Sequence, residues 1–145
     1  MPRLDAERIA LWRQFERSST DVRRRIDIAL SDDHNVPLAW FEVLSAIRDA
    51  GGSIRVGELC EQLDEVPSSL SRRLDRMEAH ALVSRQAALS IDDRRAVSVA
   101  IEREGREIWR DANITYRRMV QDLFARRLTD TDIAALHRIF GKLTP

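Results

Sequence analysis

The sequence predicts a mainly α-helical (α+β) fold in which a two-stranded hairpin lies between groups of helices. Along most of the chain, apolar residues recur three or four positions apart, which is the period of a helix. Residues 82–86 and 96–101 are predicted to be strands, because both runs are short and the second alternates between apolar and small polar side chains. Two short helices with a tight turn between them precede this hairpin. The middle of the chain therefore has the order of a winged helix-turn-helix.

Length and composition favour one domain, residues 1–145. The chain has 145 residues, 43% of them hydrophobic, which is ample for one core. No apolar run approaches the roughly 18 residues of a membrane span, and no basic-then-apolar leader is visible. We therefore expect a cytoplasmic protein without a membrane partner. The net charge is zero, from 24 basic and 24 acidic residues, so binding to DNA requires positive charge that is gathered locally.

Three helices are expected before the candidate DNA-binding helix. The first precedes a turn-forming cluster at residues 31–37, and its apolar positions are Ile9, Trp12, Phe15, Val22, Ile26 and Ala29. The second stops at Gly51-Gly52 after the apolar positions Trp40, Val43, Leu44 and Ile47. The third is short and ends at Asp64-Glu65, with the apolar positions Val56, Leu59, Cys60 and Leu63.

The helix that begins at Pro67 has two contrasting faces. Leu70, Leu74 and Met77 form an apolar stripe, and serine and arginine side chains lie on or near the other side. Serine can donate to phosphate, and arginine can hold O6 and N7 of guanine with two hydrogen bonds. The candidate DNA contacts of this helix are Pro67, Ser68, Ser69, Ser71, Arg72, Arg73 and Arg76.

The alternative is a solvated surface helix that happens to be rich in arginine. Arginine supplies every cation of the chain except Lys142, so an arginine cluster alone is a weak argument. Between residues 66 and 95, six arginines stand against four acidic residues, a local excess of two. Asp75 and Glu78 lie on the helix itself, and helical spacing allows them to form surface pairs with Arg72 or Arg76.

The hairpin loop carries the run Asp92-Asp93-Arg94-Arg95. We expect Asp93 to orient an arginine by paired hydrogen bonds, and Arg94 and Arg95 to enter a minor groove, where a narrow groove has enhanced negative potential. The alternative is an ordinary surface salt bridge in a turn.

These residues resemble the MarR family of bacterial transcription regulators. The resemblance rests on three motifs and extends along nearly the whole chain: Pro67-Ser68-Ser69-Leu70-Ser71-Arg72, Leu82-Val83-Ser84-Arg85 and Asp93-Arg94-Arg95-Ala96. In that family Asp93 and Arg95 would mark the wing. The resemblance implies an obligate homodimer on a pseudo-palindromic operator of double-stranded DNA, usually a repressor. It also implies release by a small, frequently phenolic or anionic, effector.

The sequence departs from the family pattern at three positions. Asp64 and Ala81 stand where glycine is common, and Glu102 stands at the usual threonine cap site. A left-handed backbone conformation at Ala81 would cost a modest amount of conformational free energy, which glycine in its place would not. A glutamate near a helix N-terminus still suits the helix dipole, although it caps less well than threonine.

The two ends of the chain are expected to be dimerisation helices, at residues 1–33 and 102–145, around a winged helix-turn-helix at residues 37–101. A long helix is predicted over residues 102–127, spanning roughly 38 Å, with a last helix over residues 129–143 capped by Thr129. Such a helix has more apolar face than a small winged helix needs. The alternative to a dimer is that it folds back on the first helix within one chain.

Five aromatic residues are candidates for the wall of a pocket for a small aromatic or anionic effector: Trp12, Phe15, Trp40, Trp109 and Tyr116. The alternative is that they are core residues, which is the commoner role of aromatics at helical spacing.

Catalytic and metal-binding signatures are missing from the sequence. His34, His80 and His137 have no companion ligands at a spacing typical of zinc, so we expect no metal. We expect no cofactor and no enzyme, since no phosphate-binding glycine loop, nucleophile elbow or carboxylate pair is present. Cys60 is expected to be a small buried side chain, with redox sensing as the alternative.

The sequence therefore predicts a homodimeric, DNA-binding transcription regulator. The competing hypothesis is a winged-helix module that uses the same face for protein–protein interaction without specific DNA binding.

Overall fold

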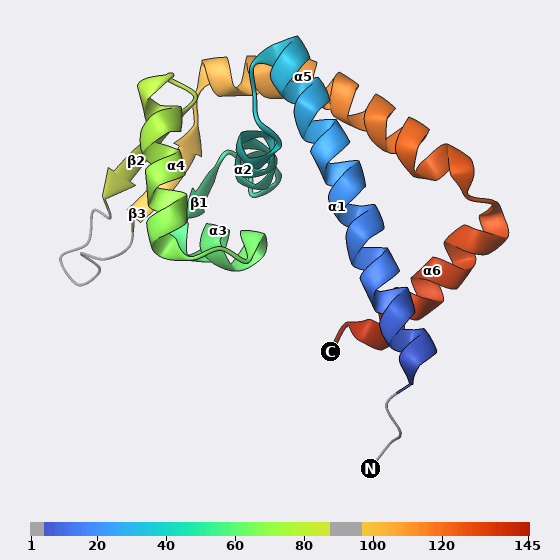
Figure 1. Ribbon diagram of the computed structural model, residues 1–145. Coiled ribbons are helices and arrows are strands. Elements are labelled where there is room, and N and C mark those ends of the chain that lie inside the picture. The colour runs from blue at the N-terminus through green and yellow to red at the C-terminus, as the bar shows by residue number, and fades with distance from the viewer. Residues whose placement is uncertain (1–4, 88–96) are drawn as a thin grey trace.

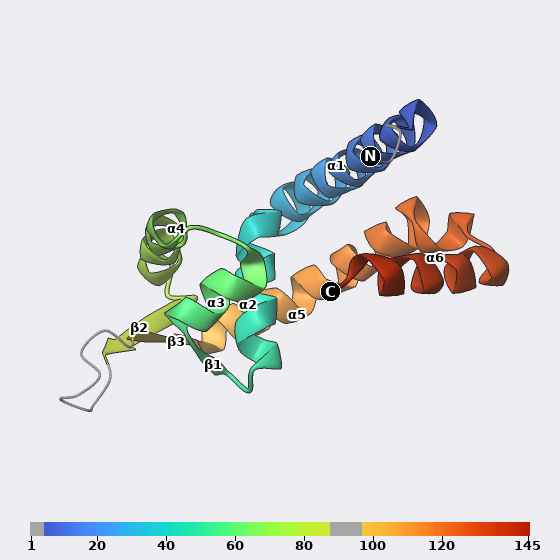
Figure 2. The same ribbon diagram turned by 90° about the horizontal axis from the view of Figure 1, so that it is seen from below.

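The computed structural model describes residues 5–87 and 97–145. In chain order the elements are α1 (Ala6–His34), α2 (Leu38–Asp49), β1 (Ser53–Arg55), α3 (Val56–Leu63), α4 (Pro67–Ala79), β2 (Val83–Ala87), β3 (Val97–Ile101), α5 (Arg103–Leu123), a 3-10 turn (Ala125–Arg127) and α6 (Asp130–Leu143). Figures 1 and 2 both show α3, α4 and the strands on one side of the molecule, with α1 and α6 on the other. The predicted mainly α fold with a winged helix-turn-helix is confirmed.

The sheet has three antiparallel strands in the order β1-β3-β2, so the prediction of two strands missed one. Ile54 of β1 and Arg85 of β2 both face Val99 of β3 in the register. Strand β1 has only three residues and follows directly on Gly51-Gly52, so it is too short to show an alternating pattern. It forms because its backbone pairs with the edge of β3 that is not paired with β2.

One hydrophobic cluster holds the helix-turn-helix against the sheet. Leu70, Leu74 and Met77 of α4 are fully buried in it, which confirms the predicted apolar stripe. Cys60 of α3 is buried in the same cluster, as predicted. The serine and arginine positions of α4 must therefore lie toward solvent or the flanks of the helix.

A second cluster forms where α1, α2 and α5 meet. Its buried members are Ile26, Leu30, Val36, Leu38, Phe41 and Ala112. Trp40, Ile108 and Trp109 pack against both clusters and so join the winged helix to the long helices. A hydrogen bond of 2.8 Å between His34 Nε2 and Thr115 Oγ1 ties the end of α1 to α5.

Helix ends are set by local chemistry. The backbone is left-handed at Asn35, Asp64 and Ala81, so the two positions where glycine was the expected residue do adopt the conformation that favours it. Helix α1 continues through the predicted turn cluster to His34, because its stop is the left-handed Asn35. The N–H of Asn35 donates to the carbonyl of Ser31 at 3.0 Å, and the N–H of Val36 donates to that of Leu30 at 3.4 Å.

Three further helix ends can be compared with the predicted helix boundaries and caps. Helix α5 stops at Leu123 and gives way to the 3-10 turn, earlier than the predicted end at residue 127. Thr129 caps α6 as predicted, in a capping box with Asp132, whose pKa is lowered by the backbone N–H and hydroxyl of Thr129. Glu102 makes no cap hydrogen bond, since its carboxylate accepts from the hydroxyl of Ser84.

Large apolar side chains remain exposed on α1 and α6. They are Leu11, Trp12, Phe15 and Ile28 on α1 and Ile139, Phe140 and Leu143 on α6. The rings of Phe15 and Phe140 meet edge to face at 6.5 Å, which places α6 beside the N-terminal half of α1. No residue of α6 is buried. Among the described residues, no helix is both long and apolar enough to cross a membrane.

Candidate nucleic-acid interface

The exposed face of α4 presents arginine next to short polar side chains. Pro67, Ser68, Arg72 and Arg76 are all exposed. Pro67 occupies the first turn, where no intrahelical N–H bond is lost. Within the described ranges, 5–87 and 97–145, neither Arg72 nor Arg76 has an acidic partner. Two guanidinium groups one helical turn apart are thus available for a ligand that carries negative charge.

Arg73 lies on the flank of α4 and is already engaged. Its Nη1 donates to Oε1 of Glu65 at 2.5 Å, with only 18% of the arginine and 24% of the glutamate side chain exposed. Glu65 belongs to the turn between α3 and α4. Its other carboxylate oxygen, Oε2, is buried and has no hydrogen-bond partner among the described residues. The side chain of Arg73 is therefore bound to the turn between α3 and α4, and its contact with DNA stays a prediction.

The acidic residues of α4 do not pair with Arg72 or Arg76, so that expectation was wrong. Asp75 and Glu78 both pair with Arg85 of β2. The Arg85 backbone N–H donates to Oε1 of Glu78 at 2.6 Å, and Nη2 donates to Oε2 of Glu78 at 3.0 Å and to the Asp75 carboxylate. Ser71 is half-buried beside them and accepts from Nη1 of Arg85 at 3.4 Å.

Pairing between Glu78 and Arg85 shifts the pKa of both groups in the direction that favours their ionised forms. The hydrogen bonds from the side chain and then the backbone of Arg85 lower the pKa of Glu78, against a smaller opposing effect of burial. The hydrogen bonds to Asp75 and Glu78 raise the pKa of Arg85. The pairing of Arg85 with Asp75 and Glu78 is absent from the predictions made from the sequence. The available signal was the spacing of Asp75 and Glu78, which puts two carboxylates on one face of the helix, opposite a strand arginine.

The predicted wing contacts, Asp93, Arg94 and Arg95, lie outside the described residues. Strand β2 ends at Ala87 and strand β3 begins at Val97, so the two strands lead toward this segment. Because β2 also carries Arg85, the hairpin and α4 are tied directly to each other.

The five predicted pocket aromatics form two separate groups. Trp12 and Phe15 stack on each other at 6.2 Å on the exposed part of α1. Trp109 and Tyr116 instead stack on Phe41 in the core, at 6.3 and 4.7 Å. Trp40 packs there too and meets His80, at the end of α4, with ring centroids 5.4 Å apart. The structure does not bring the five side chains to one cavity.

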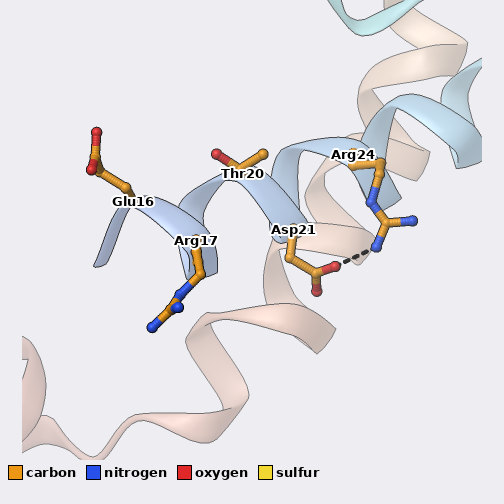
Figure 3. A pocket seen from close by; sticks show the side chains of 5 residues that line it. All are labelled: Glu16, Arg17, Thr20, Asp21 and Arg24. Atoms are coloured by element: carbon orange, nitrogen blue, oxygen red, sulfur yellow. Dashed lines mark hydrogen bonds and ion pairs between the residues drawn. The ribbon is translucent and has the colours of Figure 1, made fainter. Parts of the chain in front are cut away.

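Two of the surface depressions in the described part of the chain are lined by other residues than these aromatics. One, of about 410 Å³, lies along α1 at Glu16, Arg17, Thr20, Asp21 and Arg24, where Asp21 and Arg24 form an ion pair (Figure 3). The other, of about 460 Å³, lies at Arg48, Asp49, Gly51, Gly52, Ile101 and Arg106. No cluster of three or more potential metal ligands is found among the residues that the structure describes.

Sequence comparison places the middle of the chain among known regulators. A sequence model of the MarR family matches residues 34–96. The chain is also 31% identical over 93 residues to the uncharacterized HTH-type transcriptional regulator YhbI of Bacillus subtilis (strain 168). That match covers 64% of this chain and 58% of the relative, so it spans less than two thirds of the relative's length.

The fold is similar to solved structures over almost its whole length. A mutant of MarR from E. coli, solved in complex with operator DNA, is 28% identical with a TM-score of 0.83, covering 98% of this chain and 99% of that one. Sco3205 of Streptomyces coelicolor, a MarR family transcriptional regulator solved in complex with DNA, is 24% identical with a TM-score of 0.88, covering 99% and 89%. The helices on both sides of the winged helix are therefore part of the shared fold.

Proposed function

We propose that this chain, whose residues 34–96 match the sequence model of the MarR family, is a member of that family and a transcription regulator that binds double-stranded DNA with sequence specificity. The observation that carries the proposal is the exposed face of α4, where Arg72 and Arg76 have no acidic partner among the described residues. A second helix of a helix-turn-helix reads base edges in the major groove. The E. coli MarR structure, which matches nearly the whole chain, contains operator DNA and supports this use of the fold.

Each candidate residue has a distinct part in the proposal. Ser68 lies in the first turn of α4, where it can donate to phosphate, and Arg72 and Arg76 can reach bases or phosphates from the next turns. Arg94 and Arg95 contact the minor groove, with Asp93 orienting them. Ser69, Ser71 and Arg73 are half-buried, so their share in DNA contact is smaller than that of the exposed residues.

A homodimer is the second part of the proposal. Apolar side chains stay exposed on α1 and α6, and Trp12 and Phe15 are each at least half exposed. An exposed apolar surface of this kind marks a site of association. A second copy of the chain covering α1 and α6 would place two α4 helices in successive major grooves, roughly 34–36 Å apart, on an inverted repeat.

The mode of regulation is also proposed from the family. The regulator represses transcription from a pseudo-palindromic operator, and binding of a small aromatic or anionic effector releases the DNA. A regulator of this kind works in the cytoplasm, where its operator is. No cofactor is required for any of these steps.

DNA binding is tested with the DNA immediately upstream of the protein's own gene. We expect fluorescence anisotropy to show tighter binding to this DNA than to a scrambled duplex. A plot of log affinity against log salt concentration should fall with a slope of about 0.9 for every phosphate that the protein neutralises. The double variant Arg72→Ala/Arg76→Ala is expected to bind at least tenfold more weakly, as roughly 1–3 kcal/mol is lost for each specific base contact.

The matched control is Arg106→Ala/Arg110→Ala, which removes two exposed arginines at the same spacing from α5. It is expected to leave specific binding nearly unchanged. Equal, salt-insensitive binding to both duplexes by the wild type would contradict the proposal and favour the protein-interaction module.

The dimer is tested by light scattering during gel filtration. The wild type is expected at twice the 16.7 kDa mass of the chain. Phe15→Ala/Phe140→Ala removes the edge-to-face ring contact and much of the exposed apolar surface, so it is expected to shift the mass toward one chain. The control is Val66→Ala, an exposed apolar residue at the start of α4. A monomeric wild type at micromolar concentration would contradict the dimer.

A further inference from the structure

Arg85 of β2 makes an unusually complete set of contacts with α4. Its guanidinium donates to Glu78 through Nε at 3.3 Å and through Nη2 at 3.0 Å, to Asp75 through Nη2 and to Ser71 through Nη1 at 3.4 Å. The backbone N–H of the same residue donates to Glu78. Only 24% of the Arg85 side chain and 32% of the Glu78 side chain is exposed. We call Arg85, Ser71, Asp75 and Glu78 the Arg85 clamp.

This inference rests on the proposed function and adds to it. We infer that the Arg85 clamp fixes the recognition helix α4 relative to the β2–β3 hairpin, so that Asp75 and Glu78 act as positioning residues that promote sequence-specific DNA binding. Asp75 and Glu78 would then strengthen specific binding, although they carry the same negative charge as DNA.

The geometry shows why the clamp acts on both DNA-binding elements at once. Asp75 and Glu78 are three residues apart on α4, and Arg85 faces Val99 of β3 in the strand register. The clamp therefore joins the helix to a strand that leads to the hairpin loop. A specific complex needs the helix in a major groove and the hairpin at a neighbouring groove together, and a change in their relative angle separates the two contacts.

The same contacts leave Arg85 little capacity to bind DNA itself. A guanidinium has five N–H donors, and all three nitrogens of Arg85 already donate to protein groups. Arg72 and Arg76, in contrast, have no acidic partner among the described residues. The arginines around α4 thus divide into two kinds, those available for DNA and those that hold the unit together.

The direction of the effect separates positioning from simple repulsion. If Asp75 and Glu78 only repelled phosphates, neutralising either one would strengthen binding to every DNA sequence. If they position α4, neutralisation would weaken specific binding and leave nonspecific binding equal or stronger. A purely structural role would lower the melting temperature without changing the ratio of specific to nonspecific affinity in the folded protein.

The experiment compares Glu78→Gln and Asp75→Asn with wild type, on the upstream DNA and on a scrambled duplex, over a salt series. The control is Glu61→Gln, which neutralises an exposed acid on α3 that belongs to no ion pair among the described residues. Thermal unfolding followed by circular dichroism identifies a temperature at which all variants are folded, and binding is measured at that temperature. Asp75 is largely exposed, so Asp75→Asn keeps the test available if Glu78→Gln does not fold.

We expect Glu78→Gln to lower specific affinity roughly tenfold, the usual effect of losing hydrogen bonds to a charged group. Its salt slope should stay that of wild type, because no phosphate contact is lost. Unchanged or stronger specific binding in both variants would overturn the inference while leaving the proposed function intact. If the wild type itself shows no specific binding, the proposed function fails, and the inference fails with it.

Discussion

Gly105→Ala is expected to destabilise the protein by about 3 kcal/mol, since it forces a side chain into packed backbone. Gly105 lies in the first turn of α5 and is buried. A Cβ there would overlap the carbonyl oxygen of Leu82, and it would lie 3.0 Å from Cγ1 of Ile101 and 3.1 Å from the carbonyl carbon of Leu82. The Leu82 carbonyl also accepts from the N–H of Glu102 at 2.9 Å. Because the nearest atoms belong to the Leu82 backbone, which is itself hydrogen-bonded, space for the added methyl group requires a backbone shift and not only a side-chain rotation.

The matched control is Gly57→Ala in α3, where an added Cβ meets nothing within 4 Å. That variant is expected to be equal to wild type or more stable by up to about 1 kcal/mol, because alanine favours the helix and restricts the unfolded chain. Urea denaturation followed by circular dichroism measures both changes. A Gly105→Ala midpoint equal to that of wild type would show that α5 and the backbone of Leu82, just before β2, do not approach as closely as the structure has them.

Elements with strong periodicity could be predicted from the sequence. The stripe Leu70, Leu74 and Met77 identified the buried face of α4, because three apolar positions at helical spacing leave only one way to face a core. Thr129 marked the start of α6 because threonine is a common helix cap, and the structure shows this cap as a capping box with Asp132. In both places the information lies in neighbouring residues, so no knowledge of the tertiary fold was needed.

Features that depend on distant partners could not be predicted in the same way. Strand β1 exists through its pairing with β3, and three residues carry no period of their own. The partner of Asp75 and Glu78 was sought on α4, whereas Arg85 reaches them from a strand. Helical spacing predicts which residues of the same helix could pair with Asp75 and Glu78. Tertiary packing decides whether their partner is one of these residues or an arginine from another element.

The same difference between local signals and distant partners applies to the candidate DNA-binding residues. Exposure of Arg72 and Arg76 follows from their place opposite the apolar stripe, which the sequence contains. The sequence predicts Arg73 as a DNA contact, and in the structure its Nη1 donates to Oε1 of Glu65 in the turn at 2.5 Å. Whether an arginine faces solvent can be predicted from a helical wheel, and whether it is already paired cannot.

Trp109→Ala is expected to cost about 3 kcal/mol, the second of the two largest effects, because this side chain joins the two hydrophobic clusters. Its ring stacks on Phe41 at an interplanar angle of 6°, and the guanidinium of Arg48 lies 4.0 Å from its centroid. Its Nε1 donates to the hydroxyl of Ser45 at 2.8 Å. Alanine removes all of these contacts at once and leaves a cavity between α2 and α5.

Trp12→Ala is the matched control, since it removes the same side chain from an exposed position on α1. Unfolding is measured at several protein concentrations, because the midpoint of a dimer rises with concentration. In Trp109→Ala the midpoint should fall at every concentration and still rise with concentration, as in wild type. In Trp12→Ala the rise itself should shrink, because the residue belongs to the surface proposed to bind a second copy. Equal losses in the two variants, with no change in concentration dependence, would contradict both the core role of Trp109 and the dimer surface on α1.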